Sequence, residues 1–350
     1  MSVTAADARS LPEHPRLAVE ALFEAAAERS GRVERSYAVA GQSVTCRFAG
    51  EEMLLRVGRA FDHLRAPATG AGLTINIWDS ESTGGAAPPL LGEQLSTEDG
   101  PMYYYERNGV KALNRWRSLS VLDEESAQAW FWAPAPDAIP SWEAAAPLRA
   151  ILHWWLGRRG TLQLHGGAVG TPDGGVLLVG RGGSGKSTSS LACLTAGLRY
   201  AGDDYVAVAP HPQPWVHSLY SSGKLEDHQL ARFPELGGAV GNPEREAGEK
   251  AVVYVEEAAP GAAIAGFPLR AILVPRVVAQ TPETRAVPRP AGAALAALAP
   301  STIFQLHPPQ PDALAEMGAL VGRVPCFTLE LGSDLGLIPE AVVELLEALR

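Results

Sequence analysis

One stretch of this 350-residue sequence decides its interpretation: Gly180-Arg181-Gly182-Gly183-Ser184-Gly185-Lys186-Ser187-Thr188. It contains the pattern G-x-x-x-x-G-K-[ST], which is typical of a loop that holds phosphate groups. The apolar run over 175–179 predicts a buried parallel strand that ends at the loop, and residues 188–198 predict the helix that follows. A strand, a glycine-rich loop and a helix in this order surround one concavity with backbone N–H groups, backed by the positive end of the helix. The sequence therefore predicts a nucleotide-binding site.

The residues expected to bind the nucleotide all belong to this loop. They are Gly180, Gly182, Gly183, Ser184, Gly185, Lys186, Ser187 and Thr188. Lys186 would reach the β- and γ-phosphates, and the Ser187 hydroxyl would face Mg²⁺. The alternative is a glycine-rich surface turn. It is disfavoured because the chain has four lysines against twenty-five arginines, so a lysine falls at this position by chance only rarely.

Composition and charge narrow the class of protein. The formal net charge is −10 and no basic block is present, so the chain as a whole would repel nucleic acid. Cys46, Cys193 and Cys326 form no C-x-x-C pair and two of them lie in apolar segments, which favours buried thiols over ligands or bridges. Residues 1–32 show an amphipathic helix pattern without the apolar core of a signal peptide or a membrane span. We therefore expect a cytoplasmic protein that binds neither nucleic acid nor membrane.

The chain has room for two domains. The proline-rich run over 133–140 interrupts regular structure, and we place the boundary between 133 and 160. Short strands and helices over residues 1–145 predict a smaller α+β domain, and residues 146–350 predict an α/β domain around the phosphate loop. Strands are expected at 36–39, 44–48, 73–78, 103–105, 110–113, 162–169, 176–179, 205–208, 252–255, 271–278 and 326–331. Helices are expected at 53–64, from Trp142 or Pro147 to Leu156, and at 188–198, 291–298, 313–321 and 339–349, with a loop-rich middle section that includes 211–214 and 237–248.

Two short runs flank the phosphate loop. His165 precedes Lys186 by twenty-one residues, and the pair Asp203-Asp204 follows it by seventeen and eighteen. A helix and a turn return the chain to the sheet beside the loop, so both carboxylates are expected close to a bound triphosphate. One can hold Mg²⁺, and the other can accept a proton from an attacking hydroxyl. The alternatives are a solvated turn at the aspartate pair and a hydrogen-bonded histidine at a strand end.

These runs carry a resemblance to a known family. His165-Gly166, the stretch from Gly180 to Ser187, and Gly202-Asp203-Asp204-Tyr205-Val206 resemble the catalytic domain of HPr kinase/phosphorylase, whose fold is related to phosphoenolpyruvate carboxykinase. The resemblance covers about residues 160–350. It implies that Asp203 is the catalytic base, that Asp204 helps to hold the metal, and that His165 lies near the transferred phosphate or the metal. The implied fold is an α/β P-loop catalytic domain of HPr kinase type, and the implied cofactors are ATP and Mg²⁺.

The chain departs from the family in one region. HPr kinases carry Glu-Ile/Leu-Arg-Gly-Leu/Ile-Gly some forty residues after the loop, where this chain has His-Ser-Leu-Tyr-Ser-Ser-Gly-Lys-Leu over 217–225. The missing glutamate and arginine argue against HPr as the substrate and against the reverse, phosphate-driven reaction. Lys224, Ser221 and Ser222 lie where the family closes over the site, and they either touch phosphate or substrate or form a surface turn.

The chain looks more like divergent HPr-kinase-like serine kinases of bacterial biosynthetic clusters, some of which modify a ribosomal precursor peptide such as a lasso peptide. The runs 298–302 and 324–332 are similar to that group. The leading interpretation is an ATP-dependent phosphotransferase that moves the γ-phosphoryl group to a serine of a peptide or small protein, selected by residues 1–145. The residues expected to be catalytic are Asp203, Lys186, His165 and Arg270, and those expected to hold the metal are Ser187 and Asp204.

Several alternatives stay open. Arg270 and Arg276 flank a predicted strand and would neutralise the transferring group, but a surface salt bridge is as good an interpretation of either. The same core would serve a kinase for a small-molecule hydroxyl. A nucleotide-driven ATPase or switch is disfavoured because the Leu-Ser-Gly-Gly-Gln and Asn-Lys-x-Asp motifs are absent from the sequence. A homo-oligomer is possible, since related kinases often assemble.

Overall fold

The computed structural model describes residues 15–97, 100–115, 117–278 and 280–350, so residues 1–14 of the expected N-terminal helical segment lie outside it. The chain divides into two compact units. Unit 1 consists of the chain up to Tyr37, Gln42–Gly58 and Ala66–Pro140. Unit 2 consists of Ala38–Gly41, Arg59–Arg65 and Ser141–Arg350. Two short pieces of the N-terminal third therefore belong to unit 2.

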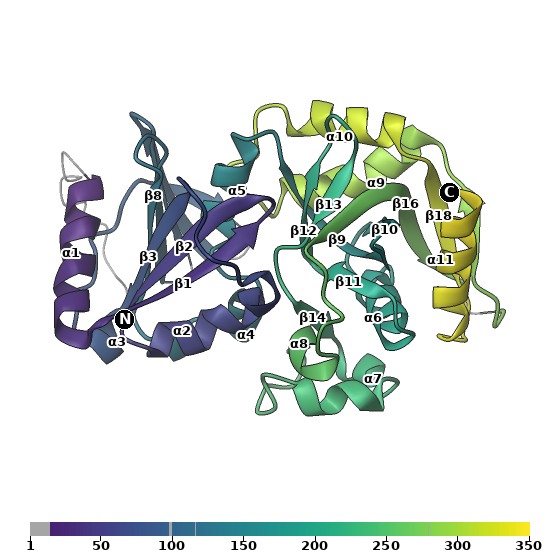
Figure 1. Ribbon diagram of the computed structural model, residues 1–350, viewed down its shortest axis with the longest axis horizontal. Helices are drawn as coiled ribbons and strands as arrows, with labels where there is room; N and C mark the ends of the chain where they lie inside the picture. The colour runs from purple at the N-terminus through teal and green to yellow at the C-terminus, as the bar shows by residue number, and fades with distance from the viewer. Residues whose placement is uncertain (1–14, 98–99, 116, 279) are drawn as a thin grey trace. The chain divides into compact units, whose positions relative to one another are not determined.

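Unit 1 is built on an eight-stranded sheet in the order β1-β2-β3-β8-β7-β6-β5-β4 (Figure 1). The β2–β3 and β3–β8 pairs are parallel, whereas the strands from β8 to β4 pair antiparallel. Its elements are α1 (Pro15–Ser30), β1 (Arg32–Val39), β2 (Gln42–Ala49), α2 (Glu52–Val57), β3 (Leu73–Asp79), α3 (Ser80–Thr83), β4 (Glu93–Thr97), β5 (Gly100–Arg107), β6 (Val110–Arg115), β7 (Ser118–Asp123) and β8 (Gln128–Ala133). The expected helix over 53–64 is α2 followed by the 3₁₀ helix Gly58–Leu64.

The core of unit 1 joins α1 to the parallel strands. Phe23 of α1 is fully buried and meets the edge of Trp78, with ring centroids 6.1 Å apart. Trp130 of β8 belongs to the same cluster, and Trp132 packs against it. These two tryptophans are therefore core residues of unit 1. They belong to one strand of the sheet, in which successive side chains point to opposite faces.

Unit 2 holds a second eight-stranded sheet with α-helices on both faces (Figure 1). Its strands are β9 (Leu162–Thr171), β10 (Gly174–Val179), β11 (Arg199–Gly202), β12 (Tyr205–Ala209), β13 (Trp215–His217), β16 (Gly266–Val277), β17 (Arg285–Pro288) and β18 (Cys326–Leu331). A small two-stranded sheet is formed by β14 (Ser222–Leu225) and β15 (Ala251–Tyr254). The helices are α4 (Ser141–Ala144), α5 (Arg149–Gly157), α6 (Lys186–Thr195), α7 (Asp227–Leu230), α8 (Val255–Ala258), α9 (Ala291–Ile303), α10 (Ala313–Arg323) and α11 (Leu337–Ala348).

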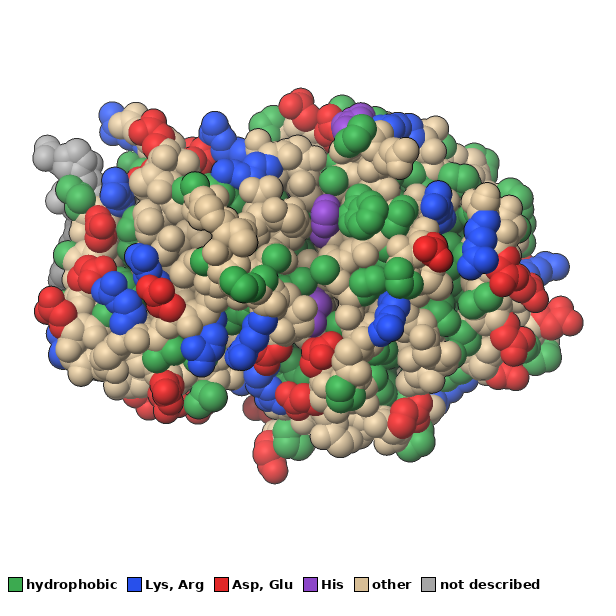
Figure 2. Space-filling view, in the orientation of Figure 1, with side chains coloured by type: hydrophobic (Ala, Val, Ile, Leu, Met, Phe, Trp, Pro, Cys, Tyr) green, Lys and Arg blue, Asp and Glu red, His purple; other side chains and the backbone are tan. Residues whose placement is uncertain are grey.

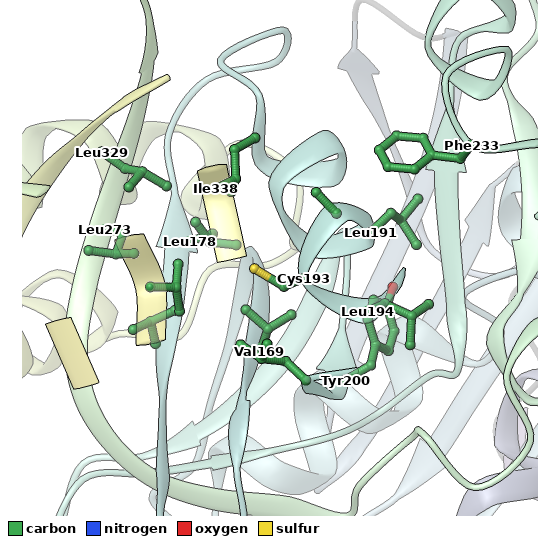
Figure 3. Close-up of a cluster of buried hydrophobic side chains, with 14 of the residues drawn as sticks. Val169, Leu178, Leu191, Cys193, Leu194, Tyr200, Phe233, Leu273, Leu329 and Ile338 are labelled. Carbon is green, nitrogen blue, oxygen red and sulfur yellow. The ribbon is translucent and has the colours of Figure 1, made fainter. Parts of the chain in front are cut away.

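Alternate residues of β10 face opposite layers of helices. Val176 and Leu178 pack with α6 and α11, in the cluster that also holds Cys193 (Figure 3). Leu177 and Val179 pack on the other face with residues of α9 and α10. Both faces of the strand are therefore buried, which explains its continuous apolar sequence. The three cysteines are free and buried, as the sequence indicated.

Three expectations for unit 2 need correction. β10 is not simply a parallel strand, because it pairs parallel with β16 and antiparallel with β9. The helix expected over 188–198 begins at Lys186 and ends at Thr195, because the chain turns at Gly197 and enters β11. The section interpreted as loop-rich also contains β13, β14 and α7.

Candidate active site

Strand, loop and helix follow one another at the phosphate loop as the sequence predicts. β10 ends at Val179, and α6 begins at Lys186 with Gly185 as its N-cap. Gly185 has a φ of +105°, and a Cβ there would lie 2.5 Å from Cδ1 of Leu331, so only glycine fits. The first N–H groups of α6 have no partner within the helix and are available to an anion.

Lys186 is held over its own loop. Its ammonium donates to the carbonyl oxygens of Gly180, at 2.7 Å, and Arg181, at 3.2 Å. The side chain is buried, and burial lowers its pKa against the opposing effect of Asp203 and Asp204. A lysine that is held by two loop carbonyls can turn to a phosphate oxygen without crossing the site, which suits the expected role.

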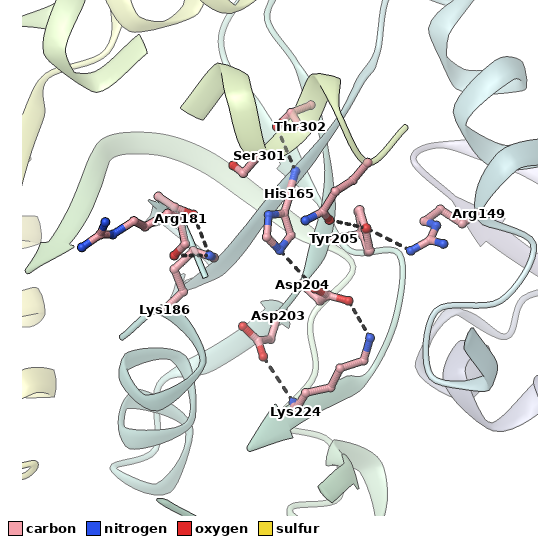
Figure 4. A network of polar contacts seen from close by, with 12 residues as sticks. Arg149, His165, Arg181, Lys186, Asp203, Asp204, Tyr205, Lys224, Ser301 and Thr302 are labelled. Carbon is pink, nitrogen blue, oxygen red and sulfur yellow. Dashed lines mark hydrogen bonds and ion pairs between the residues drawn. The ribbon is translucent and has the colours of Figure 1, made fainter. Parts of the chain in front are cut away.

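The antiparallel strands next to the loop bring the histidine and the aspartates together. Tyr205 of β12 lies opposite His165 of β9, and the N–H of Gly166 donates to the carbonyl of Asp204 at 3.0 Å. Asp204 has a φ of +75°, a left-handed conformation that aspartate tolerates better than most residues. The turn before β12 therefore presents both carboxylates at the end of the sheet that carries the phosphate loop (Figure 4).

Asp203 is almost fully buried. Its Oδ2 accepts from the backbone N–H of Lys224 at 3.3 Å, and its Oδ1 has no hydrogen-bond partner among the residues that the structure describes. Burial and the neighbouring charge of Asp204 raise its pKa, against the lowering effect of the Ser187 hydroxyl, the Lys224 N–H and Lys186. A carboxylate with a raised pKa is a better proton acceptor than an ordinary aspartate.

Asp204 has the opposite electrostatic character. Its Oδ2 lies 2.6 Å from the ammonium of Lys224, and its Oδ1 lies 3.2 Å from Nε2 of His165. Burial alone would raise its pKa, but Lys224 and His165 hold the pKa well below the usual value. Asp204 is therefore an ionised carboxylate, suited to a cation and poorly suited to taking up a proton.

His165 is fixed by the elements around it. Its backbone N–H donates to Oγ1 of Thr302 at 3.2 Å, and its ring packs against Tyr205 with centroids 5.6 Å apart. Tyr205 in turn donates to Gln305 at 2.6 Å and accepts from Arg149 at 2.9 Å. Nδ1 of His165 is buried without a partner in the described part of the chain. Figure 4 shows the imidazole between the phosphate loop and the Tyr205 ring.

The side chains converge on one cleft of about 90 Å³. Six of the eight expected loop residues line it, whereas Gly180 and Ser184 do not. His165, Asp203 and Asp204 line it as well. Sequence reasoning left Lys224 undecided and missed Lys250, which also lines the cleft. The one feature of the sequence that could have drawn attention to Lys224 and Lys250 is that lysine is rare in this chain.

The structure places Arg270 outside the cleft that the other expected catalytic residues line. Arg270 lies near the start of β16, where its guanidinium donates to the carbonyl of Asp173 at 3.0 Å and packs against Gly174. β16 runs parallel to β10, so the start of β16 lies beside the start of β10, and the phosphate loop follows the other end. Arg276 also has a different role, because it pairs with Glu330 on the surface.

The donor set fits one magnesium ion. Mg²⁺ is commonly held by one or two carboxylates together with phosphate oxygens and water. Ser187, Asp203 and Asp204 offer a hydroxyl and two carboxylates in one cleft, and Oδ1 of Asp203 is a buried oxygen without a donor. No group of three or more His, Cys, Asp or Glu side chains suited to a metal occurs in the part of the chain that the structure describes. A metal here would therefore depend on the nucleotide for several of its ligands.

Comparison with known proteins gives little beyond this. No protein-family model matches the chain, and no curated protein matches it. Among solved structures, the HPr(Ser) kinase/phosphatase from Coxiella burnetii aligns over 53% of this chain and 90% of its own, with 14% identity and a TM-score of 0.32. A TM-score this low does not show a shared fold, so the function proposed below rests on the side chains of the cleft. Within the described ranges, no helix has both the length and the apolar character needed to cross a bilayer.

Proposed function

We propose that this chain is an ATP-dependent kinase that transfers the γ-phosphoryl group to a serine hydroxyl of a peptide or small protein. One observation carries the proposal: a phosphate loop with its lysine, a buried aspartate of raised pKa and an ionised aspartate all face one cleft. Binding of a nucleotide alone would not require the second and third of these groups.

Each residue of the cleft is assigned its own role in phosphoryl transfer. Lys186 and the N–H groups at the start of α6 bind the phosphates. Ser187 and Asp204 would hold Mg²⁺, which would supply positive charge to the phosphate groups. The acceptor oxygen bonds to the γ-phosphorus as the bond from phosphorus to the β,γ-bridging oxygen breaks. The electron pair of that bond stays on ADP, and the hydroxyl proton passes to Asp203. His165 keeps Asp204 oriented through its 3.2 Å contact.

The acceptor is expected to be a short, extended segment. A disordered serine-containing segment can lie across an open phosphate site and bring one hydroxyl to Asp203. The Glu-x-Arg-Gly signature is absent, and with it the arginine that would help hold two phosphates close together, so HPr phosphorylation and phosphorolysis are not expected. We assign selection of the acceptor to residues 1–145.

The proposal is tested by offering alternative acceptors together. The full chain is incubated with radiolabelled ATP and Mg²⁺ in the presence of HPr, serine-containing precursor peptides, a panel of small hydroxyl compounds, or no acceptor. Label on a peptide serine supports the proposal. Label on HPr overturns the assigned acceptor, label on small compounds alone favours the small-molecule kinase, and release of phosphate without an acceptor favours an ATPase. The Lys186→Ala variant serves as the matched blank in every arm.

A further inference from the structure

The cleft contains more lysines than the composition of the chain would lead one to expect. The chain has four lysines against twenty-five arginines, and three of the four, Lys186, Lys224 and Lys250, line the cleft. Lys186 belongs to the phosphate loop. The position of Lys224 requires its own explanation, because it comes from β14, outside the strand–loop–helix element.

Lys224 touches both aspartates. Its ammonium lies 2.6 Å from Oδ2 of Asp204, and its backbone N–H lies 3.3 Å from Oδ2 of Asp203. Its side chain is 12% exposed and points from β14 across the cleft to Asp204, as Figure 4 shows. The ammonium therefore lies against the carboxylate that is expected to hold the metal.

The strand that carries Lys224 is held firmly, whereas the side chain is long. Tyr200 donates to the carbonyl of Ser222 at 2.7 Å, and a Cβ at Gly223 would lie 3.2 Å from Leu191 of α6. Ser221 donates from its N–H to the carbonyl of Ala60 at 2.9 Å. The backbone at Lys224 is thus fixed against the phosphate-loop helix, while four flexible methylenes let the ammonium choose between neighbouring anions.

Two cations cannot both bind one carboxylate oxygen without strong electrostatic repulsion between them. A divalent ion within about 4 Å of an ammonium repels it strongly, even at the effective dielectric constant of about 20 found near protein surfaces. A bound triphosphate offers the displaced ammonium new oxygens in the same cleft. Lys224 therefore has two alternative partners, Asp204 before the nucleotide and metal arrive and phosphate afterwards.

We propose that the ammonium of Lys224 competes with the divalent cation for Asp204, and that Lys224 is a phosphate-contacting catalytic residue when the cation binds that carboxylate. This inference rests on the proposed kinase function and names a further residue for it. The contacts of Lys224 also help to explain how two adjacent aspartates are accommodated in one cleft.

The test separates metal binding from chemistry. Lys224→Gln and Lys224→Arg are compared with Arg270→Gln, which removes a cation at the far end of the sheet. The first readout is the Mg²⁺ dependence of binding of a fluorescent, non-hydrolysable ATP analogue. The second is the single-turnover rate of phosphoryl transfer to the peptide acceptor. We expect Lys224→Gln to need on the order of tenfold less Mg²⁺ for half-maximal binding, because its competitor for Asp204 is gone. We also expect it to transfer on the order of a hundredfold more slowly, with partial rescue by Lys224→Arg.

A measurement on the unaltered chain guards against a variant that fails to fold. The rate at which a dilute acetylating reagent modifies Lys224 is followed by mass spectrometry, with and without the analogue and Mg²⁺. The acetylation rate is expected to fall severalfold when the analogue and Mg²⁺ are bound, because the ammonium then contacts phosphate in a cleft that the nucleotide fills. Failure of the analogue to bind at all would count against the kinase itself. Normal binding together with unchanged Mg²⁺ dependence, transfer rate and acetylation rate would overturn only the role of Lys224.

Discussion

A Cβ atom at Gly167 would lie 2.4 Å from Oγ of Ser190, so β9 and the phosphate-loop helix touch with no room for a side chain between them. Oδ1 of Asp203 lies 3.3 Å from the same position. The second glycine of the His-Gly-Gly run thus sets the distance between the phosphate loop and the aspartate that is expected to act as the base.

Gly167→Ala should lower both stability and activity. The added methyl would force Ser190 or β9 to move, which costs about 1–3 kcal/mol in a packed interior and displaces Asp203 from the loop. Urea denaturation and the transfer rate measure the two effects. Gly322→Ala is the matched control, since a Cβ there meets nothing within 4 Å and alanine favours the helix α10. A Gly167→Ala protein with full stability and full activity would contradict the packing argument.

Lys186→Ala should abolish phosphoryl transfer while the protein stays folded. Within the described part of the chain, the ammonium of Lys186 donates to carbonyl oxygens of its own loop, so its loss removes little from the core. Loss of the charge-assisted contact to the transferring group should slow turnover on the order of a thousandfold or more. Radiolabel transfer and a thermal melt measure the two properties. Equal turnover by the variant and the parent would refute the phosphate-loop assignment.

Asp203→Asn and Asp204→Asn should fail in different ways. The first variant should keep nucleotide binding and slow transfer roughly a hundredfold or more, because the amide cannot accept the hydroxyl proton. The second should raise the Mg²⁺ concentration needed for activity, because an amide is a weaker ligand than a carboxylate. Transfer rates are measured across a Mg²⁺ titration for both. Identical titration curves with equal losses would disprove the division of roles.

Arg270→Gln should leave phosphoryl transfer unchanged. The guanidinium bonds to Asp173 at the end of the sheet away from the phosphate loop, so its removal does not alter the charge in the cleft. Steady-state transfer rates at several ATP concentrations test this. A large loss of kcat would restore the catalytic role that the sequence had indicated.

Asp204 should make stability depend on pH under acid conditions. Lys224 and His165 hold its pKa in the folded protein well below the unfolded value of about 3.9. The unfolded chain therefore binds this proton first, so the stabilisation from Asp204 is complete above about pH 4 and is lost as the pH falls further toward the folded pKa. Urea denaturation at about pH 6 and about pH 3 should show a larger loss for the parent than for Asp204→Asn. Equal losses in the two proteins would exclude this carboxylate as a source of the acid sensitivity.

The features that could be predicted from the sequence are those that depend on residues close together in the chain. The phosphate loop, β10, α6 and the aspartate turn are encoded by neighbouring residues, and each was located closely. Lys224 could not be assigned, because its ion pair depends on the pairing of β14 with β15 and on packing against α6. Arg270 was expected at the site but lies outside the cleft, for a reason that the sequence already contained. Phosphate loops follow the carboxyl ends of strands, whereas Arg270 lies toward the amino end of its own strand.

The division into units also changes how acceptor selection should be tested. Removal of residues 1 to about 135 would delete Arg59–Arg65, which belongs to unit 2. Within that segment, the Ala60 carbonyl accepts from Ser221, and Nε2 of His63 lies 2.6 Å from the hydroxyl of Ser218. Such a truncation would loosen the strand that carries Lys224. Point substitutions on unit 1 test acceptor selection without this effect.

The short span of β9 to β12 has a consequence for the order of folding. Residues 162–209 supply His165, the phosphate loop and both aspartates, and their strands join largely through antiparallel pairs close in sequence. Short loops cost little closure entropy, so this edge should form early, whereas Lys224 must await β15 and the segment at Arg59–Arg65. Substitutions within 162–209 should therefore slow folding, and those around β14 should mainly speed unfolding. The anion-binding half of the site would then exist, for a short time on each folding event, before the residue that completes it.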